Sequence, residues 1–148
     1  MDARRDEALR SILATKLDRG IAAKEIAEWI AATRQHRWVG IYEVTPSEIE
    51  MIACSGTKPP SFPRFPTSRG LCGAVVAEKS IVNVGDVRKD SRWLETFGTT
   101  RSEIIVPVFA GDGRVTGLID VESDALNAFG KADEEFLVDC AAEITALF

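Results

Sequence analysis

Three carboxylates are the residues of this chain best placed to do chemistry, because they interrupt segments that are otherwise largely apolar. Residues 102–109 and 114–123 have the composition of two strands, and the glycine-rich turn between them is typical of a hairpin. Side chains alternate across a strand, so Asp120 and Glu122 project from one face, about 6–7 Å apart along the chain. A tight hairpin would bring Glu103 on the neighbouring strand close to this acidic pair.

Three acids on one face repel one another and resist burial unless a cation or hydrogen-bond donors meet them. The cluster is therefore a candidate site for a ligand that carries an amino group. The alternative is that the acidic face is simply the solvated side of a sheet whose other side packs on the core. The remaining elements of the chain bear on this choice.

The composition favours a single globular domain. The chain has 148 residues, of which 45% are hydrophobic and 28% charged, with a net charge of −5. No run of basic residues suggests a surface for nucleic acid or for an anionic membrane, and no apolar stretch reaches membrane-spanning length. The first ten residues lack the apolar segment of a signal peptide. We therefore expect a cytoplasmic protein that contacts neither nucleic acid nor membrane.

Cysteine and histidine usage narrows the possible chemistry. Cys54, Cys72 and Cys140 are widely spaced and form no Cys-x-x-Cys unit, which favours neither a zinc site nor a disulfide framework. His36 is the single histidine and lies in a polar run, where a surface position is expected. Any mechanism that needs a histidine base would depend on that residue. We expect no metal and no cofactor.

The order of predicted elements indicates an α+β fold with a mostly antiparallel sheet. Helices are expected at 3–18, 22–34, 70–78 and 131–148, and Gly20 is the expected stop signal of the first. Strands are expected at 37–44, 48–55, 80–84, 102–109 and 114–123. Residues 56–69 contain four prolines and should form a long loop, and 86–100 should form a second loop with a helical turn at 93–97. The terminal helices would cover one face of the sheet, and the two loops would cover a pocket on the other face.

The first helix suggests a second unit within this architecture. We divide the chain into an N-terminal helix at 1–19 and a main domain at 20–148. The apolar stripe of Leu9, Ile12 and Leu13 continues beyond what the sheet needs for its cover. Exposed apolar helix faces usually find a partner, so we expect a homodimer formed by the N- and C-terminal helices.

Several local motifs resemble those of the GAF domain. They are Gly70-Leu71-Cys72-Gly73 at a helix start, Asp86-Val87 after a strand, Ser102-Glu103-Ile104-Ile105-Val106-Pro107-Val108, and Gly117-Leu118-Ile119-Asp120-Val121-Glu122-Ser123. Within that superfamily the chain is most similar to the branch of the free methionine-(R)-sulfoxide reductases. The resemblance spans roughly residues 20–147. It implies a GAF-like antiparallel sheet with the terminal helices on one face and a loop-covered ligand pocket on the other.

The resemblance also implies a set of binding residues. Those reductases bind the free amino acid with an aromatic pair on the first strand and acids on the last two strands. The matching positions are Trp38, Tyr42, Glu103, Asp120 and Glu122, the last being Asp in most of the family. Aromatic side chains near acids suit an ammonium group on a small apolar body. Plain core packing is the alternative for the aromatic pair.

The positions of the cysteines differ from those in the reductase family. The reductases attack the sulfoxide sulfur with a cysteine in the loop before Ser-Glu-Ile-Val and resolve the product as a disulfide. The corresponding stretch here, 90–101, has no cysteine, and neither has 56–69, where a second family cysteine belongs. Only Cys72 remains, at a predicted helix N-terminus that should favour its thiolate. Cys54 and Cys140 are expected in the core.

Three functions are compatible with these features. The first is a stand-alone GAF-type sensor that binds an amino-acid-like small molecule without the family's reductase activity. It would signal through a partner protein or through its own dimerisation. The second is a reductase-like enzyme that uses Cys72 with an external thiol. The third is an interaction protein whose terminal helices build a dimer and whose pocket is vestigial.

Overall fold

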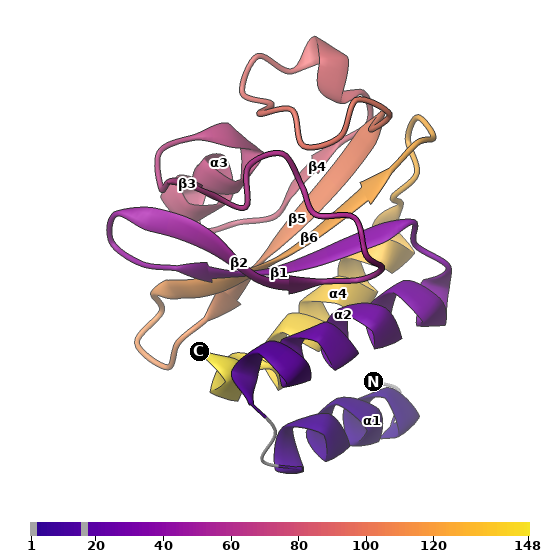
Figure 1. The fold of residues 1–148 in the computed structure, drawn as a ribbon, viewed down its shortest axis with the longest axis vertical. Coiled ribbons are helices and arrows are strands. Elements are labelled where there is room, and N and C mark those ends of the chain that lie inside the picture. The colour runs from indigo at the N-terminus through magenta and orange to yellow at the C-terminus, as the bar shows by residue number, and fades with distance from the viewer. Residues whose placement is uncertain (1–2, 16–17) are drawn as a thin grey trace.

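The computed structural model describes residues 3–15 and 18–148 and confirms the α+β fold (Figure 1). The elements in chain order are α1 (Ala3–Ala14), α2 (Arg19–Arg34), β1 (Trp38–Val44), β2 (Glu48–Cys54), β3 (Arg64–Pro66), α3 (Gly70–Glu78), β4 (Val82–Val84), the 3-10 helix η1 (Val87–Lys89), β5 (Ser102–Phe109), β6 (Val115–Ser123), α4 (Lys131–Glu143) and the 3-10 helix η2 (Thr145–Leu147). No helix in the described part of the chain is long and apolar enough to cross a membrane.

One six-stranded sheet organises the molecule. Its strand order is β3-β2-β1-β6-β5-β4, and the neighbouring strands run antiparallel. Helices α2 and α4 lie against one face, while α3 and the long loops lie over the other (Figure 1). β6 occupies a central place between β1 and β5. Its two faces therefore both end up buried, one against the helices and one under the loops.

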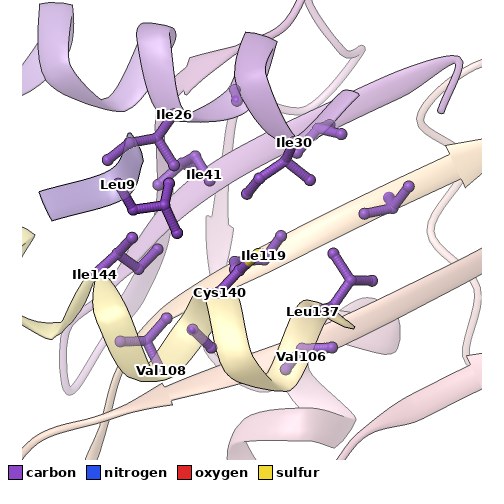
Figure 2. Packing of buried hydrophobic residues seen from close by; sticks show 14 of the residues in the cluster. Leu9, Ile26, Ile30, Ile41, Val106, Val108, Ile119, Leu137, Cys140 and Ile144 are labelled. Atoms are coloured by element: carbon purple, nitrogen blue, oxygen red, sulfur yellow. The ribbon is translucent and has the colours of Figure 1, made fainter. Parts of the chain in front are cut away.

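The main core lies between the sheet and the two helices. Alternation along each central strand turns branched aliphatic side chains towards α2 and α4, as Figure 2 shows. The contributors are Val39 and Ile41 of β1, Ile104, Val106 and Val108 of β5, Ile119 and Val121 of β6, Ile26 and Ile30 of α2, and Leu137, Cys140 and Ile144 of α4. This packing fixes which side chains of β1, β5 and β6 face the opposite way.

Helix α1 packs on the outer side of α2 and α4 rather than on the sheet (Figure 1). Leu9 is fully buried within its own chain, and Ile12 and Leu13 pack against the same core cluster. An ion pair between Arg10 and Glu143 of α4 lies beside this contact, 3.0 Å from N to O. The apolar stripe of α1 is thus largely used inside one chain and gives no support to the expected homodimer, which stays a prediction.

Two predictions about the N-terminal helices need correction. The described part of α1 ends at Ala14, and the end of the predicted helix at 3–18 runs through residues 16–17, outside the described residues. Gly20 is no stop signal, because it lies in the first turn of α2 and donates its N–H to Oδ1 of Asp18 at 2.9 Å. Asp18 is the N-cap that starts α2 at Arg19.

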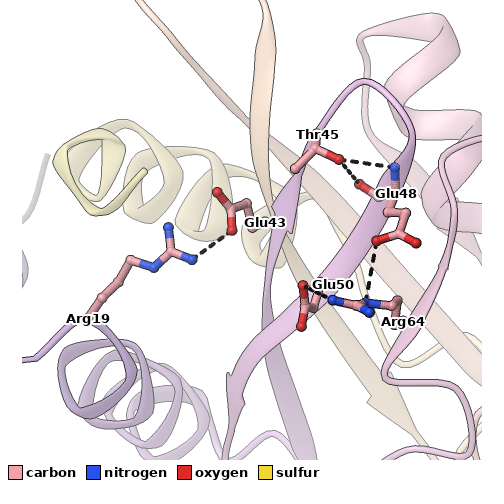
Figure 3. Close-up of polar contacts among 6 residues, drawn as sticks. All are labelled: Arg19, Glu43, Thr45, Glu48, Glu50 and Arg64. Atoms are coloured by element: carbon pink, nitrogen blue, oxygen red, sulfur yellow. Dashed lines mark hydrogen bonds and ion pairs between the residues drawn. The ribbon is translucent and has the colours of Figure 1, made fainter.

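The two long loops also differ from expectation. The proline-rich loop contains β3, which adds to the outer edge of β2. Arg64 of β3 forms ion pairs with Glu48 and Glu50 across that edge, although exposed pairs of this kind contribute little (Figure 3). The predicted helical turn at 93–97 is wrong, since the helical turn in this loop is η1. It begins where a carboxylate oxygen of Asp86 accepts the N–H of Arg88.

Candidate ligand-binding site

The antiparallel pairing of β5 with β6 brings the three predicted acids together. Glu103 lies directly opposite Glu122, and Asp120 follows on the same face of β6. One carboxylate oxygen from each of the three residues lies within 4.8 Å of the others. The acids are only 3%, 2% and 0% exposed in chain order, so the solvated-face alternative for them is wrong. Such a group of oxygens could hold a cation, either an ammonium or a hard metal ion.

The aromatic pair from β1 forms a wall beside the acids. In the pairing of β1 with β6, Trp38 lies opposite Glu122 and Gly40 opposite Asp120. Trp38 and Tyr42 are both almost fully buried. Their rings reach over Gly40: a methyl group there would sit 2.5 Å from Cη2 of Trp38 and 2.8 Å from Cε2 of Tyr42. The structure therefore places all five predicted residues on one face of three adjacent strands.

Several polar atoms on this face have no hydrogen-bond partner among the described residues. Thr100, which is fully buried, donates its hydroxyl to Oε1 of Glu122 at 2.9 Å. Oε2 of Glu103, Oδ1 of Asp120 and Oε2 of Glu122 have no hydrogen-bond partner, and neither has the indole N–H of Trp38. Buried polar groups are normally paired, so this concentration of unpaired atoms needs an explanation.

A small cavity lies against the acids. It is lined by Tyr42, Phe62, Phe65, Gly70, Leu71, Cys72, Trp93, Leu94, Thr96, Glu103 and Asp120. Trp38 and Glu122 are not among the lining residues. The cavity volume is about 20 Å³, room for roughly one water molecule. Pockets that hold small ligands typically measure about 300–1,000 Å³, so a ligand can enter only if lining side chains move.

The residues that close the cavity come from the two long loops. Phe62 and Phe65 lie in the proline-rich segment, and Trp93 follows η1. The two segments are tied together, because the backbone N–H and the hydroxyl of Ser61 both donate to the carbonyl oxygen of Thr96, at 3.2 and 2.9 Å. The two loops therefore form the lid expected from the sequence, over a cavity of about 20 Å³. The individual lid residues were not predicted, although two phenylalanines between prolines were a usable signal.

Residues 17–147 match the family model described as GAF domain. The chain belongs to the GAF domain family. It is 33% identical over 100 residues to GAF domain-containing protein A of Dictyostelium discoideum, which covers 68% of this chain and 62% of that protein. It is 36% identical over 69 residues to the free methionine-R-sulfoxide reductase of Saccharomyces cerevisiae, which covers 47% of this chain and 38% of that enzyme.

A solved structure gives a similar result over more of the chain. The free methionine-R-sulfoxide reductase of Neisseria meningitidis, determined in complex with its substrate, superposes with a TM-score of 0.84 at 30% identity. The match covers 95% of this GAF domain and 83% of that chain. This chain spans less than two thirds of the length of the first curated relatives that it matches. The comparisons confirm the predicted resemblance in fold and family.

Burial raises the pKa values of all three acids of this GAF domain. The pKa of Asp120 rises to about 7 because its carboxyl is desolvated. The pKa of Glu122 rises to about 9, through desolvation and then the charge of Asp120. Desolvation and the charges of Asp120 and Glu122 raise the pKa of Glu103 well above its usual range. The raised pKa values favour protonated carboxyls in the cluster near neutral pH.

These shifts predict an unusual dependence of stability on pH. A carboxyl with a raised pKa keeps its proton in the folded chain at pH values where the unfolded chain has released it, so stability falls as pH rises through that interval. The interval runs from the ordinary value of 3.8 to about 7 for Asp120, and from 4.5 to about 9 for Glu122. Acids paired with an arginine, such as Asp86, whose pKa is lowered by its hydrogen bond with Arg88, titrate below this interval.

We therefore expect the free energy of unfolding of the empty domain to decrease from about pH 5 to about pH 8. Urea unfolding at several pH values measures this trend. Glu122→Gln removes one titrating carboxyl while keeping the side-chain shape, and its decrease should be shallower. A wild-type stability that rises across the same interval would contradict the assigned protonation.

Cys72 lies in the first turn of α3 and lines the cavity beside Glu103 and Asp120. The expectation that its helix position favours the thiolate is wrong. Burial, followed by the charges of Asp120, Glu103 and Glu122, raises the pKa of the Cys72 thiol well above its usual value. Desolvation and nearby negative charge thus outweigh the helix dipole. Cys54 and Cys140 are buried as predicted and do not line this cavity.

Other features lie apart from the acids. A hollow of about 810 Å³ opens beside α3 near Arg69 and Arg92, and another of about 670 Å³ lies between β5 and α4. Neither is lined by any of the five predicted site residues. His36 is half-buried, not on the surface as expected, because its ring packs on Phe129 at 5.7 Å between centroids. Phe129 belongs to the core cluster on the helix side of the sheet.

Proposed function

We propose that this GAF domain binds a small amino-acid-like molecule between the acids and the aromatic wall, and that it acts as a sensor. The ligand-binding residues are Trp38, Tyr42, Glu103, Asp120 and Glu122. The observation that carries the proposal is the group of three buried carboxylates, each with one oxygen that lacks a hydrogen-bond partner. An ammonium group offers three donors and a positive charge, which would satisfy those oxygens.

The neighbouring groups support the same class of ligand. The rings of Trp38 and Tyr42 offer apolar contact for a side chain, and aromatic faces also attract cations. The unpaired indole N–H of Trp38 could donate to an oxygen on the ligand. The similarity to a Neisseria meningitidis enzyme solved with its substrate makes free methionine-R-sulfoxide the natural first probe.

Binding would be linked to rearrangement of the lid, because the cavity is too small for such a ligand. The lid segments would then change the surface that a partner meets. We propose that the partner is another protein or a second copy of this chain, and that neither a cofactor nor nucleic acid nor a membrane is involved. A cytoplasmic setting fits free amino acids as ligands.

A thermal-shift screen of free amino acids and their oxides tests the proposal. Methionine-(R)-sulfoxide and its N-acetyl derivative form a matched pair, since acetylation removes the ammonium charge and leaves the rest of the molecule. We expect the free amino acid to raise the melting temperature and the acetylated compound to leave it unchanged. Equal shifts with both compounds, or none with any free amino acid, would rule out an ammonium site.

The second candidate function is reduction of a free sulfoxide by Cys72. The observation in its favour is that this thiol lines the same cavity as Glu103 and Asp120. In such a reaction the thiol would attack the sulfoxide sulfur, the sulfoxide oxygen would leave as water, and an external thiol would release the sulfide product while a mixed disulfide forms. Two thiols are oxidised for each sulfoxide reduced.

We expect only slow reduction of free methionine-(R)-sulfoxide with dithiothreitol as reductant. The Cys72 thiol is buried and protonated, and no second cysteine lines the cavity to resolve the intermediate. Sulfide product is measured by chromatography. If reduction is observed, Cys72→Ser should abolish it and Cys140→Ser, a buried thiol on the helix side of the sheet, should not. Turnover that survives Cys72→Ser would exclude this mechanism.

A further inference from the structure

The surroundings of the acid cluster supply little compensation for its charge. The groups that face it are Tyr42 from β1, Cys72 from α3, and Trp93, Thr96 and Thr100 from the loop before β5, besides Glu103, Asp120 and Glu122 themselves. None of these neighbours is a cation. Arg37, just before β1, is the cation that acts on Glu122, and it forms an ion pair with the exposed Asp124.

An empty site of this kind cannot hold three negative charges. Carboxylate oxygens within 4.8 Å of one another, nearly excluded from water and with one unpaired oxygen on each residue, would repel strongly in a medium of low polarity. The cavity beside them has room for roughly one water molecule. The charge is removed most simply if protons are bound to the cluster itself, and the raised pKa values agree with this.

We propose that ligand binding at the acid cluster is an exchange, in which at least one proton leaves the carboxyls for each ammonium group that enters. This inference rests on the proposed function and specifies how the same site is regulated. A protonated carboxyl has lost the charge that attracts an ammonium, so the proton and the ligand compete for the same oxygens. The proton that leaves passes to the buffer, and the ammonium keeps all of its own protons.

The closed lid contributes to this exchange. Thr96 lines the cavity, and its carbonyl oxygen is held by Ser61. Separation of the two lid segments would admit water, which favours the ionised carboxyls and gives the departing proton a way out. Acid pH would therefore stabilise the closed, empty form, and alkaline pH would favour the form that accepts ligand.

Calorimetric titration with free methionine-(R)-sulfoxide measures the exchange directly. Titrations in phosphate and in Tris, which differ in ionisation enthalpy, give the number of protons released per ligand, with EDTA present to exclude metal ions. We expect at least one proton released, and an affinity that rises about tenfold between pH 6.5 and pH 7.5. Glu122→Gln should release fewer protons. Binding with no proton release and no dependence on pH would overturn the inference while leaving the proposed function intact.

A second readout needs no ligand. Infrared spectra of the empty domain at neutral pH should contain the band of a protonated carboxyl group, which shifts or weakens in Glu122→Gln. Absence of that band would overturn the inference whether or not a ligand binds. Absence of calorimetric heat with every free amino compound would instead overturn the proposed function and the exchange together. If protons were released on addition of Mn²⁺ without EDTA, but not on addition of the amino acid, the inference would be overturned, because the cluster would bind a metal ion and not an ammonium group.

Discussion

Asp120→Ala is expected to weaken binding of an ammonium-bearing ligand on the order of 30-fold or more, with the stability of the empty domain unchanged or raised. Loss of one partner of a buried charge contact typically costs ~2–5 kcal/mol, which corresponds to that change in Kd. In the empty domain the same substitution removes one of three crowded acids and relieves desolvation of a group whose pKa is raised to about 7. Calorimetry gives the affinity and urea unfolding gives the stability.

Asp112→Ala is the matched control, because it makes the same change in the exposed turn of the same hairpin. It should alter neither ligand affinity nor, by more than about 0.5 kcal/mol, the free energy of unfolding. A purely structural Asp120 would give the opposite pattern: Asp120→Ala would destabilise the fold, and the wild-type domain would bind no amino compound.

The faces of the central strands could be predicted from the sequence because alternation has a period of two. Once Ile119 and Val121 were assigned to the core, Asp120 and Glu122 had to share the other face. A tight hairpin then brought Glu103 opposite Glu122. The position of Trp38 beside Glu122 depends on pairing between strands distant in sequence, and only the family resemblance indicated it.

The lid and the state of the thiol could not be predicted in the same way. β3 is three residues long and contains a proline, so it has no recognisable strand pattern of its own and forms only by pairing with β2. The helix dipole acts locally and can be read from the sequence, whereas the burial of Cys72 depends on how the two loops close over it. Long-range packing decided its pKa.

A similar limit applied to α1. Its apolar stripe was visible in the sequence, but a stripe does not say whether it meets the same chain or a second copy. The structure places Leu9 against α2 and α4 of its own chain. Local periodicity identifies the apolar face of a helix but does not determine which other helix that face packs against.

Gly40→Ala is expected to destabilise the domain by about 1–3 kcal/mol, the usual result of adding a methyl group to a filled core. The new methyl would lie 2.5 Å from the ring of Trp38 and 2.8 Å from that of Tyr42, and both rings are buried. Alanine is better than glycine in a strand interior by roughly 0.5–1 kcal/mol, which offsets only part of this clash. The rings must therefore shift, and because they form the wall of the pocket, ligand affinity should fall as well.

Gly111→Ala provides the comparison for this prediction. Gly111 lies in the hairpin turn, and no atom beyond its two chain neighbours lies within 4 Å of the position that a methyl group would take, so the same chemical change there meets open space. It should leave stability and affinity nearly unchanged, or raise stability slightly by restricting the unfolded chain. Urea unfolding of both variants separates the clash at Gly40 from the general effect of replacing glycine by alanine. If Gly40→Ala proves as stable as Gly111→Ala, the aromatic wall is loose enough to yield, and its rings cannot be what fixes the shape of the pocket.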